Sequence, residues 1–147
     1  MTKDVLITIS GIHMIDDADD ADVEMIVRGD YYFKNGKHYI LYDEVVEGLE
    51  GTIRNVIKVS PNGMDIIKKG AANTHMQFEK DKKTLSCYVT PLGDMMVGIQ
   101  ASRILIDEQP DSLTVDMEYS LDINYQHLSD CTIRLGVQSC PAEGWGN

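Results

Sequence analysis

The sequence predicts an all-β protein in which a single antiparallel meander of about 8–10 strands closes into a barrel. Apolar and polar side chains alternate along several segments, which is the period of a strand with one buried face. Turn-forming residues separate these segments at short intervals, without the long connections that β-sandwiches usually contain. No segment fits an amphipathic helix longer than a turn or two. The clearest alternation places on one parity Leu113, Val115, Met117, Tyr119, Leu121 and Ile123.

The strands are expected in a regular order along the chain. The first carries Val5, Ile7 and Ile9 on one face. Two aromatic-rich segments flank Asn35-Gly36, a pair that accepts positive φ and predicts a tight hairpin. The complete set of expected strands after the first is 23–33, 38–46, 52–59, 64–69, 73–79, 84–90, 95–106, 113–123 and 131–137.

The length of the chain and the number of strands together favour closure. A chain of 147 residues fits one domain, which we place at residues 1–138, with an irregular tail at 139–147. About ten strands in one open sheet would leave two exposed edges and approach the size limit of twisted sheets. Closing the sheet into a barrel removes these edges.

Composition and charge narrow the classes of partner. The net charge is −11 and the isoelectric point is about 4.6, which argues against nucleic acid as a partner because phosphate binding needs clustered cations. The chain has no run of eighteen apolar residues, which a membrane-spanning helix would need. Its N-terminus lacks the pattern of a secretory signal. Three cysteines without a C-x-x-C pair suit a reducing compartment. We therefore expect a cytoplasmic protein.

The motifs of catalysis, metal binding and cofactor binding were not found. The acidic segment 16–24 fails the calcium-loop pattern, since Ala21, Asp22 and Arg28 stand at the fifth, sixth and twelfth positions from Asp17. The four histidines show no metal-ligand spacing, and neither a nucleophile elbow nor a phosphate loop is present. The sequence therefore assigns no catalytic residue, metal or cofactor, and it favours a protein that is not an enzyme without deciding the question.

A basic strip is the main candidate for a polar site. If Ser60 pairs with Met64 across a three-residue loop, then Arg54, Lys58 and Lys68 share one face of the sheet. Such a strip would attract an anion or an internal partner such as Glu44, although the cost of burying charge favours an outer, solvated face. A two-residue turn would instead bring Lys58 opposite Asp65 and partly neutralise the strip.

Short stretches in the same order along most of the chain resemble a small bacterial family, the YwiB-like proteins of unknown function. The most specific is the element Tyr-x-Thr-Pro-x-Gly at 88–93. The other stretches are Tyr42-Asp43-Glu44, Val56-Ile57-Lys58-Val59, Ile67-Lys68-Lys69-Gly70, Met76-Gln77-Phe78 and Met117-Glu118-Tyr119-Ser120-Leu121.

The resemblance implies a calycin-like barrel, the architecture of lipocalins, and it implies no activity. A barrel of this size is either filled by its side chains or holds one small ligand. For an amphipathic or anionic small molecule in the lumen, the inward candidates are Tyr88, Met117 and Tyr119, and the polar anchors are Glu44, Lys58 and Lys68. The family tends to carry Arg where this chain has Lys68, which weakens an anion site there, since Lys does not reproduce a bidentate contact. The alternative is a filled barrel that acts as an interaction module or forms a homo-oligomer.

Overall fold

The computed structural model describes residues 1–11, 24–45, 48, 50–70, 73–90 and 93–140, and every regular element in them is a strand. The ten strands, in chain order, are β1 (Asp4–Ser10), β2 (Glu24–Lys34), β3 (Lys37–Glu44), β4 (Ile53–Ser60), β5 (Gly63–Gly70), β6 (Thr74–Glu79), β7 (Lys83–Thr90), β8 (Gly93–Gln109), β9 (Ser112–Ile123) and β10 (Gln126–Ser139). The predicted all-β class is confirmed.

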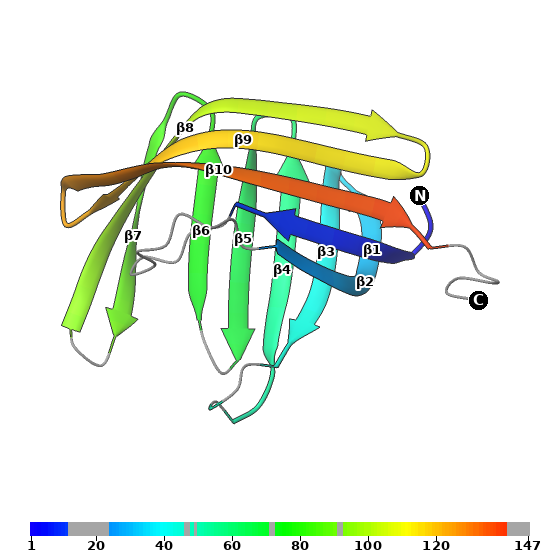
Figure 1. The fold of residues 1–147 in the computed structure, drawn as a ribbon, viewed down its shortest axis with the longest axis horizontal. Helices are drawn as coiled ribbons and strands as arrows, with labels where there is room; N and C mark the ends of the chain where they lie inside the picture. The colour runs from blue at the N-terminus through cyan, green and yellow to red at the C-terminus, as the bar shows by residue number, and fades with distance from the viewer. Residues whose placement is uncertain (12–23, 46–47, 49, 71–72, 91–92, 141–147) are drawn as a thin grey trace.

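The strands form one antiparallel sheet with the order β6-β5-β4-β3-β2-β1-β10-β9-β8-β7. In Figure 1, β1, β8, β9 and β10 run across the view, whereas β3 to β6 run steeply behind them. The sheet therefore curls into a nearly closed barrel, as predicted. Among the described residues, the seam between β6 and β7 holds no regular ladder. It is bridged near the turn, where Glu79 pairs with Lys82 and the Thr84 hydroxyl donates to the Gln77 carbonyl at 2.6 Å.

The core lies on the inner face of the curled sheet. On β9 the residues of odd number from Leu113 to Leu121 are at most 3% exposed, as the alternation predicted. On β8 the pairing shifts between Ala101 and Arg103, so Ser102 is an extra residue. This bulge changes the parity of the strand, and Ile104 follows Ala101 on the inner side.

The turns explain how short connections join the strands. Asn35 and Gly36 have φ of 54° and 76°, which confirms the predicted hairpin between β2 and β3. Asp81 and the pair Asn124 and Tyr125 also have positive φ, at φ of 62°, 50° and 69°. These residues lie in the turns expected between β6 and β7 and between β9 and β10.

Of the two turns considered after Ser60, the three-residue loop is wrong and the two-residue turn is confirmed. The structure pairs Ser60 with Gly63, so only Pro61 and Asn62 form the turn. Gly63 belongs to the ladder on both sides, since it also pairs with Glu79. A Cβ at Gly63 would lie 2.3 Å from the carbonyl oxygen of Phe78. Glycine is thus required here for the close approach of β6, and not for the turn itself.

Two expectations, the acidic segment 16–24 and the tail 139–147, fall mostly on residues that the structure does not describe. The acidic segment 16–24 falls almost entirely in 12–23, which is outside the described residues. The tail expected at 139–147 is described only for its first two residues. Ser139 ends β10, and the Cys140 amide donates to the carbonyl of Asp4 at 3.0 Å, which joins the end of β10 to the start of β1.

Candidate functional site

The observed register separates the three cations of the predicted basic strip. Lys58 lies opposite Asp65, and Asn55 lies opposite Lys68. Because successive residues of a strand face opposite sides, Lys68 points to the inner face with Asn55, whereas Arg54 and Lys58 point outward. A register change of one residue therefore moved one cation to the other side of the sheet. The prediction that the three cations share one face is wrong, and the alternative prediction of a two-residue turn is confirmed.

The two outward cations contact groups on the outer surface. The Arg54 guanidinium and the Asp43 carboxylate lie 3.0 Å apart, and both side chains are about half exposed. The Lys58 ammonium lies 5.8 Å from the ring centroid of Tyr39, in a cation–π contact. Lys58 is therefore not an anchor inside the barrel.

An inner polar cluster gathers four side chains from three neighbouring strands, namely Tyr42, Glu44, Asn55 and Lys68. Tyr42 and Asn55 face each other across β3 and β4, and Lys68 extends the row onto β5. The Lys68 ammonium donates to Glu44 Oε1 at 3.0 Å, and the Asn55 amide donates to the same oxygen at 3.3 Å. Two of the predicted anchors, Glu44 and Lys68, are therefore brought together as an internal ion pair.

Asn55 is the most buried polar residue of the cluster. Its side chain is 0% exposed, and its amide nitrogen also lies 3.5 Å from the Ile53 carbonyl. The side-chain oxygen Oδ1 is buried and accepts no hydrogen bond. Buried polar groups in folded proteins are nearly always paired, so an unpaired oxygen is a feature that calls for a partner.

The electrostatics of the cluster follow from partial burial. Burial by itself raises the pKa of Glu44, but the hydrogen bonds and charge supplied by Lys68 and Asn55 outweigh it and hold that pKa below its usual range. Burial, reinforced by the nearby charge of Glu44, raises the pKa of Tyr42 far above its ordinary value. At neutral pH Glu44 is therefore a carboxylate and Tyr42 a neutral phenol.

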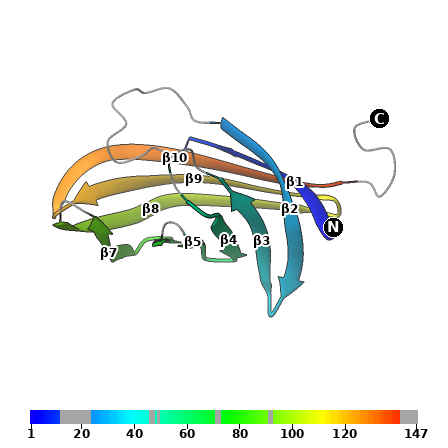
Figure 2. The same cartoon turned by 90° about the horizontal axis from the view of Figure 1, so that it is seen from below.

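The cluster lies where β2 and β3 part. Their ladder ends at the pair Asp30 and Leu41, so the last part of β3 has no partner on the β2 side. Figure 2 shows the two strands diverging from their shared hairpin. Met25 and Val27 of β2 are partly buried and pack against the core on this side. The polar residues at the end of β3 therefore lie beyond the last pair of the β2–β3 ladder, and Met25 and Val27 belong to the part of β2 on the other side of it that does not pair with β3.

The structure places two of the three predicted lumen residues, Met117 and Tyr119, in the core. Tyr119 is 2% exposed, and its ring packs edge-on against Phe78 with centroids 5.0 Å apart. Met117 is also 2% exposed within the core. Tyr88 lies on β7 opposite Met95, and its side chain falls outside the described part of the structure. Met117 and Tyr119 are therefore core residues in this structure.

A second polar network was missed by the sequence reasoning. The Tyr31 hydroxyl and His38 Nδ1 lie 2.7 Å apart, and His38 Nε2 lies 2.6 Å from Glu108 Oε1. With the proton on Nε2, the imidazole donates to Glu108 and accepts from Tyr31, so each group has a complementary partner. His38 is 8% exposed, whereas the side chain of Glu108 is 63% exposed. Burial, with the charge of Glu108, raises the pKa of Tyr31.

One signal in the sequence pointed to this network. His38 has the same parity as Ile40 and Tyr42 along the strand, which marks it as inward. Glu108, however, is 70 residues away in the chain, so only the fold brings the two together.

Three further features of the described residues concern metal binding, membrane helices and cysteines. No group of three or more His, Cys, Asp or Glu side chains among them is arranged to hold a metal ion. No helix in the described part of the chain is long and apolar enough to cross a membrane. Cys87 is exposed, Cys131 and Cys140 are buried, and all three are free thiols.

Comparison with known proteins places the chain in a family. Residues 7–135 match the family model described as "Domain of unknown function (DUF1934)". The chain belongs to this family. It is 24% identical over 120 residues to the "Uncharacterized beta-barrel protein YwiB" of Bacillus subtilis (strain 168), which spans 80% of this chain and 83% of that protein. The resemblance to YwiB-like proteins is thereby confirmed.

The DUF1934 fold agrees with a solved structure. The crystal structure of the ywiB protein from Bacillus subtilis superimposes with a TM-score of 0.72 and 19% sequence identity, covering 94% of this chain and 91% of that chain. At this identity the likeness shows the fold alone. The barrel is thus a feature that this chain shares with the ywiB protein.

Proposed function

We propose that the protein binds a small amphipathic molecule at the inner polar cluster. The observation that carries the proposal is the buried Asn55 Oδ1 without a hydrogen-bond partner. A buried acceptor left unpaired costs on the order of 1–3 kcal/mol, and a ligand that donates to it would remove this cost on binding. The apolar part of the ligand would lie against Met25 and Val27 of β2, on the same side of the sheet.

The charge balance favours a neutral head group that donates a hydrogen bond. Glu44 already neutralises Lys68, so the cluster has no spare cation for an anion. An anionic head would have to displace the carboxylate and would meet its negative charge at close range. A hydroxyl or amide head needs no such rearrangement and pairs with Asn55 Oδ1 directly.

Matched amphiphiles test this proposal. We expect 1-octanol to bind with saturable changes in the 1H–15N NMR signals of residues 42–44, 53–55 and 68–70, and octanoate to bind at least ten times more weakly. Asn55→Leu removes the acceptor and is expected to weaken 1-octanol binding at least tenfold. The proposal fails if Asn55→Leu binds 1-octanol as tightly as the wild type, or if the changes map elsewhere.

Lys68 and Lys69 provide a matched control. Lys69 follows Lys68 directly but points outward and is exposed. Lys68→Met is expected to disturb the position of Glu44 and to change 1-octanol binding severalfold, whereas Lys69→Met leaves binding unchanged. Equal effects of the two substitutions would show that the inner face is not the site.

A filled barrel that acts as an interaction module is the second candidate. The observation that favours it is an exposed aromatic pair beside the β2–β3 turn, where Tyr32 is 46% and Phe33 is 58% exposed. Exposed aromatic side chains are enriched in protein interfaces. Sedimentation velocity over a range of concentrations tests self-association through this hairpin. Association is expected to be lost in Phe33→Lys, and a monomer at all concentrations would exclude a homo-oligomer.

A further inference from the structure

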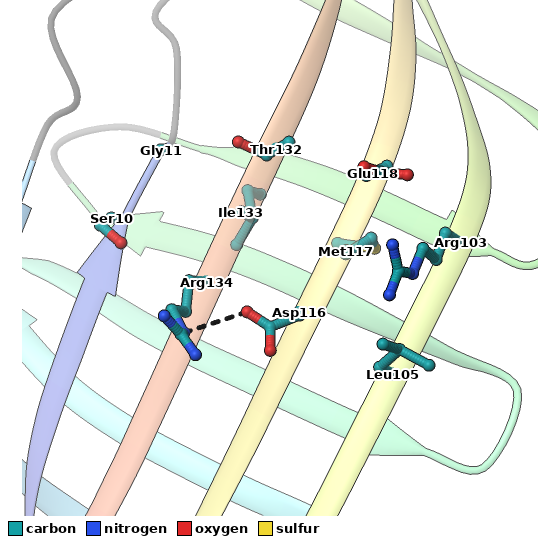
Figure 3. Close-up of a pocket in the computed structure, with 10 residues that line it drawn as sticks. All are labelled: Ser10, Gly11, Arg103, Leu105, Asp116, Met117, Glu118, Thr132, Ile133 and Arg134. Carbon is teal, nitrogen blue, oxygen red and sulfur yellow. Dashed lines mark ion pairs between the residues drawn. The ribbon is translucent and has the colours of Figure 1, made fainter.

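A separate groove lies on the outer face of the barrel, over strands β8, β9, β10 and β1 (Figure 3). Its volume is about 400 Å³, which is within the range of small-molecule sites. Charged side chains from three strands line it, namely Arg103, Asp116, Glu118 and Arg134. The groove shares no polar residue with the inner cluster, so it is independent of the function proposed above.

The strand register creates the groove. Arg134, Asp116 and Leu105 form one row across β10, β9 and β8, and Thr132, Glu118 and Arg103 form the next row. Arg103 reaches the outer face because Ser102 is the extra residue of the β8 bulge. Without the bulge, the alternation that buries Ala101 would turn Arg103 inward.

Of the two rows, only the first holds an ion pair between its charged side chains. In the first row, Arg134 Nε and Asp116 Oδ1 form an ion pair at 3.1 Å. In the second row, Arg103 and Glu118 face each other across the ladder, yet their charged atoms form no ion pair within 4.0 Å. Opposite charges in facing positions of a sheet ordinarily attract and stabilise it. The described residues thus leave one guanidinium and one carboxylate of the groove without a charged partner.

We propose that this groove binds a zwitterion of the α-amino acid class. The guanidinium of Arg103 takes the carboxylate of the ligand, for which its planar donors are suited. The carboxylate of Glu118 takes the ammonium group. The side chain of the ligand lies along Leu105, which is 49% exposed at the edge of the groove.

A zwitterion fits this groove better than a ligand with a single charge. A simple anion would pair with Arg103 but would meet the repulsion of Asp116 and Glu118, which both project from β9. A simple cation would pair with Glu118 but would meet the two arginines. A molecule that carries both charges satisfies the second row and leaves the ion pair of Arg134 and Asp116 in place.

The test compares L-leucine with two analogues that each lack one charge. At constant pH and ionic strength, 4-methylpentanoate lacks the ammonium group and 3-methylbutylamine lacks the carboxylate. We expect L-leucine to produce saturable 1H–15N shifts at residues 103–105, 116–118 and 132–134. Both analogues are expected to bind at least ten times more weakly. Equal binding of either analogue, or no saturable shift with L-leucine, would overturn the proposal.

Neutral substitutions locate the two contacts. Arg103→Gln and Glu118→Gln are both at exposed positions, and each is expected to weaken L-leucine binding at least tenfold with an unchanged melting temperature. Arg28→Gln on β2 is the matched control, because Arg28 is exposed and does not line the groove. Binding of L-leucine to either groove variant with wild-type affinity would overturn the assignment.

Discussion

The two ends of the inner face of β3 carry polar clusters that differ in how completely their buried polar atoms are hydrogen-bonded. His38 lies at the start of the strand and Glu44 at its end, about 20 Å apart for six residues of extended chain. At the His38 end, Tyr31 and Glu108 complement both ring nitrogens. At the Glu44 end, the ion pair with Lys68 is made, but Asn55 Oδ1 has no partner.

The difference separates a structural cluster from a candidate site. A hydrogen-bond network in which every group is paired fixes a conformation and offers nothing to a ligand. The His38 network also joins β3 to β8, two strands that are not neighbours in the sheet. A cluster with a buried, unpaired acceptor stores a cost that a ligand can remove. We therefore expect substitutions at the His38 end to affect stability and those at the Asn55 end to affect binding.

The largest effect is expected from His38→Ala. The change removes a buried ring and leaves the Tyr31 hydroxyl without its acceptor, so the free energy of unfolding should fall by about 3 kcal/mol. Urea denaturation followed by circular dichroism measures the loss. His75→Ala is the control, because the His75 side chain is 51% exposed, and its effect should stay within about 0.5 kcal/mol. Similar losses for both histidines would refute the structural role of the His38 network.

Glu44→Ala is expected to be the next largest, at about 2 kcal/mol. It leaves the ammonium of Lys68, which is only 31% exposed, and the amide of Asn55 without their common acceptor. The neighbouring Asp43→Ala breaks a pair in which both side chains are about half exposed, and it should cost less than about 0.5 kcal/mol. If the two substitutions cost the same in urea denaturation, the inner ion pair contributes no more than a surface one.

Asn55→Leu is expected to change the free energy of unfolding by less than about 1 kcal/mol. The loss of the hydrogen bond to Glu44 is offset by the removal of an unpaired buried oxygen. The same denaturation experiment measures it beside His38→Ala. A loss as large as that of His38→Ala would mean that the Asn55 oxygen is satisfied in solution, and the contrast between the two ends would disappear.

The smallest effect concerns pH at the Glu44 end. The pKa of Glu44 is lowered on folding, so the unfolded chain takes up the proton first as the pH falls. The stability from the ion pair is therefore fully present above the ordinary pKa of 4.5 and is lost as the pH falls through the lowered value of the folded state. The difference in free energy of unfolding between wild type and Glu44→Gln should shrink over this range. A difference that stays constant down to pH 3 would contradict the lowered pKa.

Much of the fold was accessible from local patterns. The alternation at 113–123 predicted the buried face of β9, and Asn35-Gly36 predicted the β2–β3 hairpin. The strand boundaries were less accurate, since β8 and β10 extend beyond the expected 95–106 and 131–137. Long antiparallel neighbours continue to pair past the end of the apolar pattern, because the ladder needs only backbone groups.

The sequence by itself determined the all-β class, the succession of strands and most inward positions, because side-chain alternation is a local property of extended chain. The tertiary structure alone decided the face on which Lys68 lies. That face follows from the pairing of Ser60 with Gly63, which leaves a two-residue turn and sets the register of β4 and β5. The tertiary structure also decided that His38 contacts Glu108 and that Arg103 points outward after the β8 bulge. These features depend on contacts between distant segments, which no local pattern of residues records.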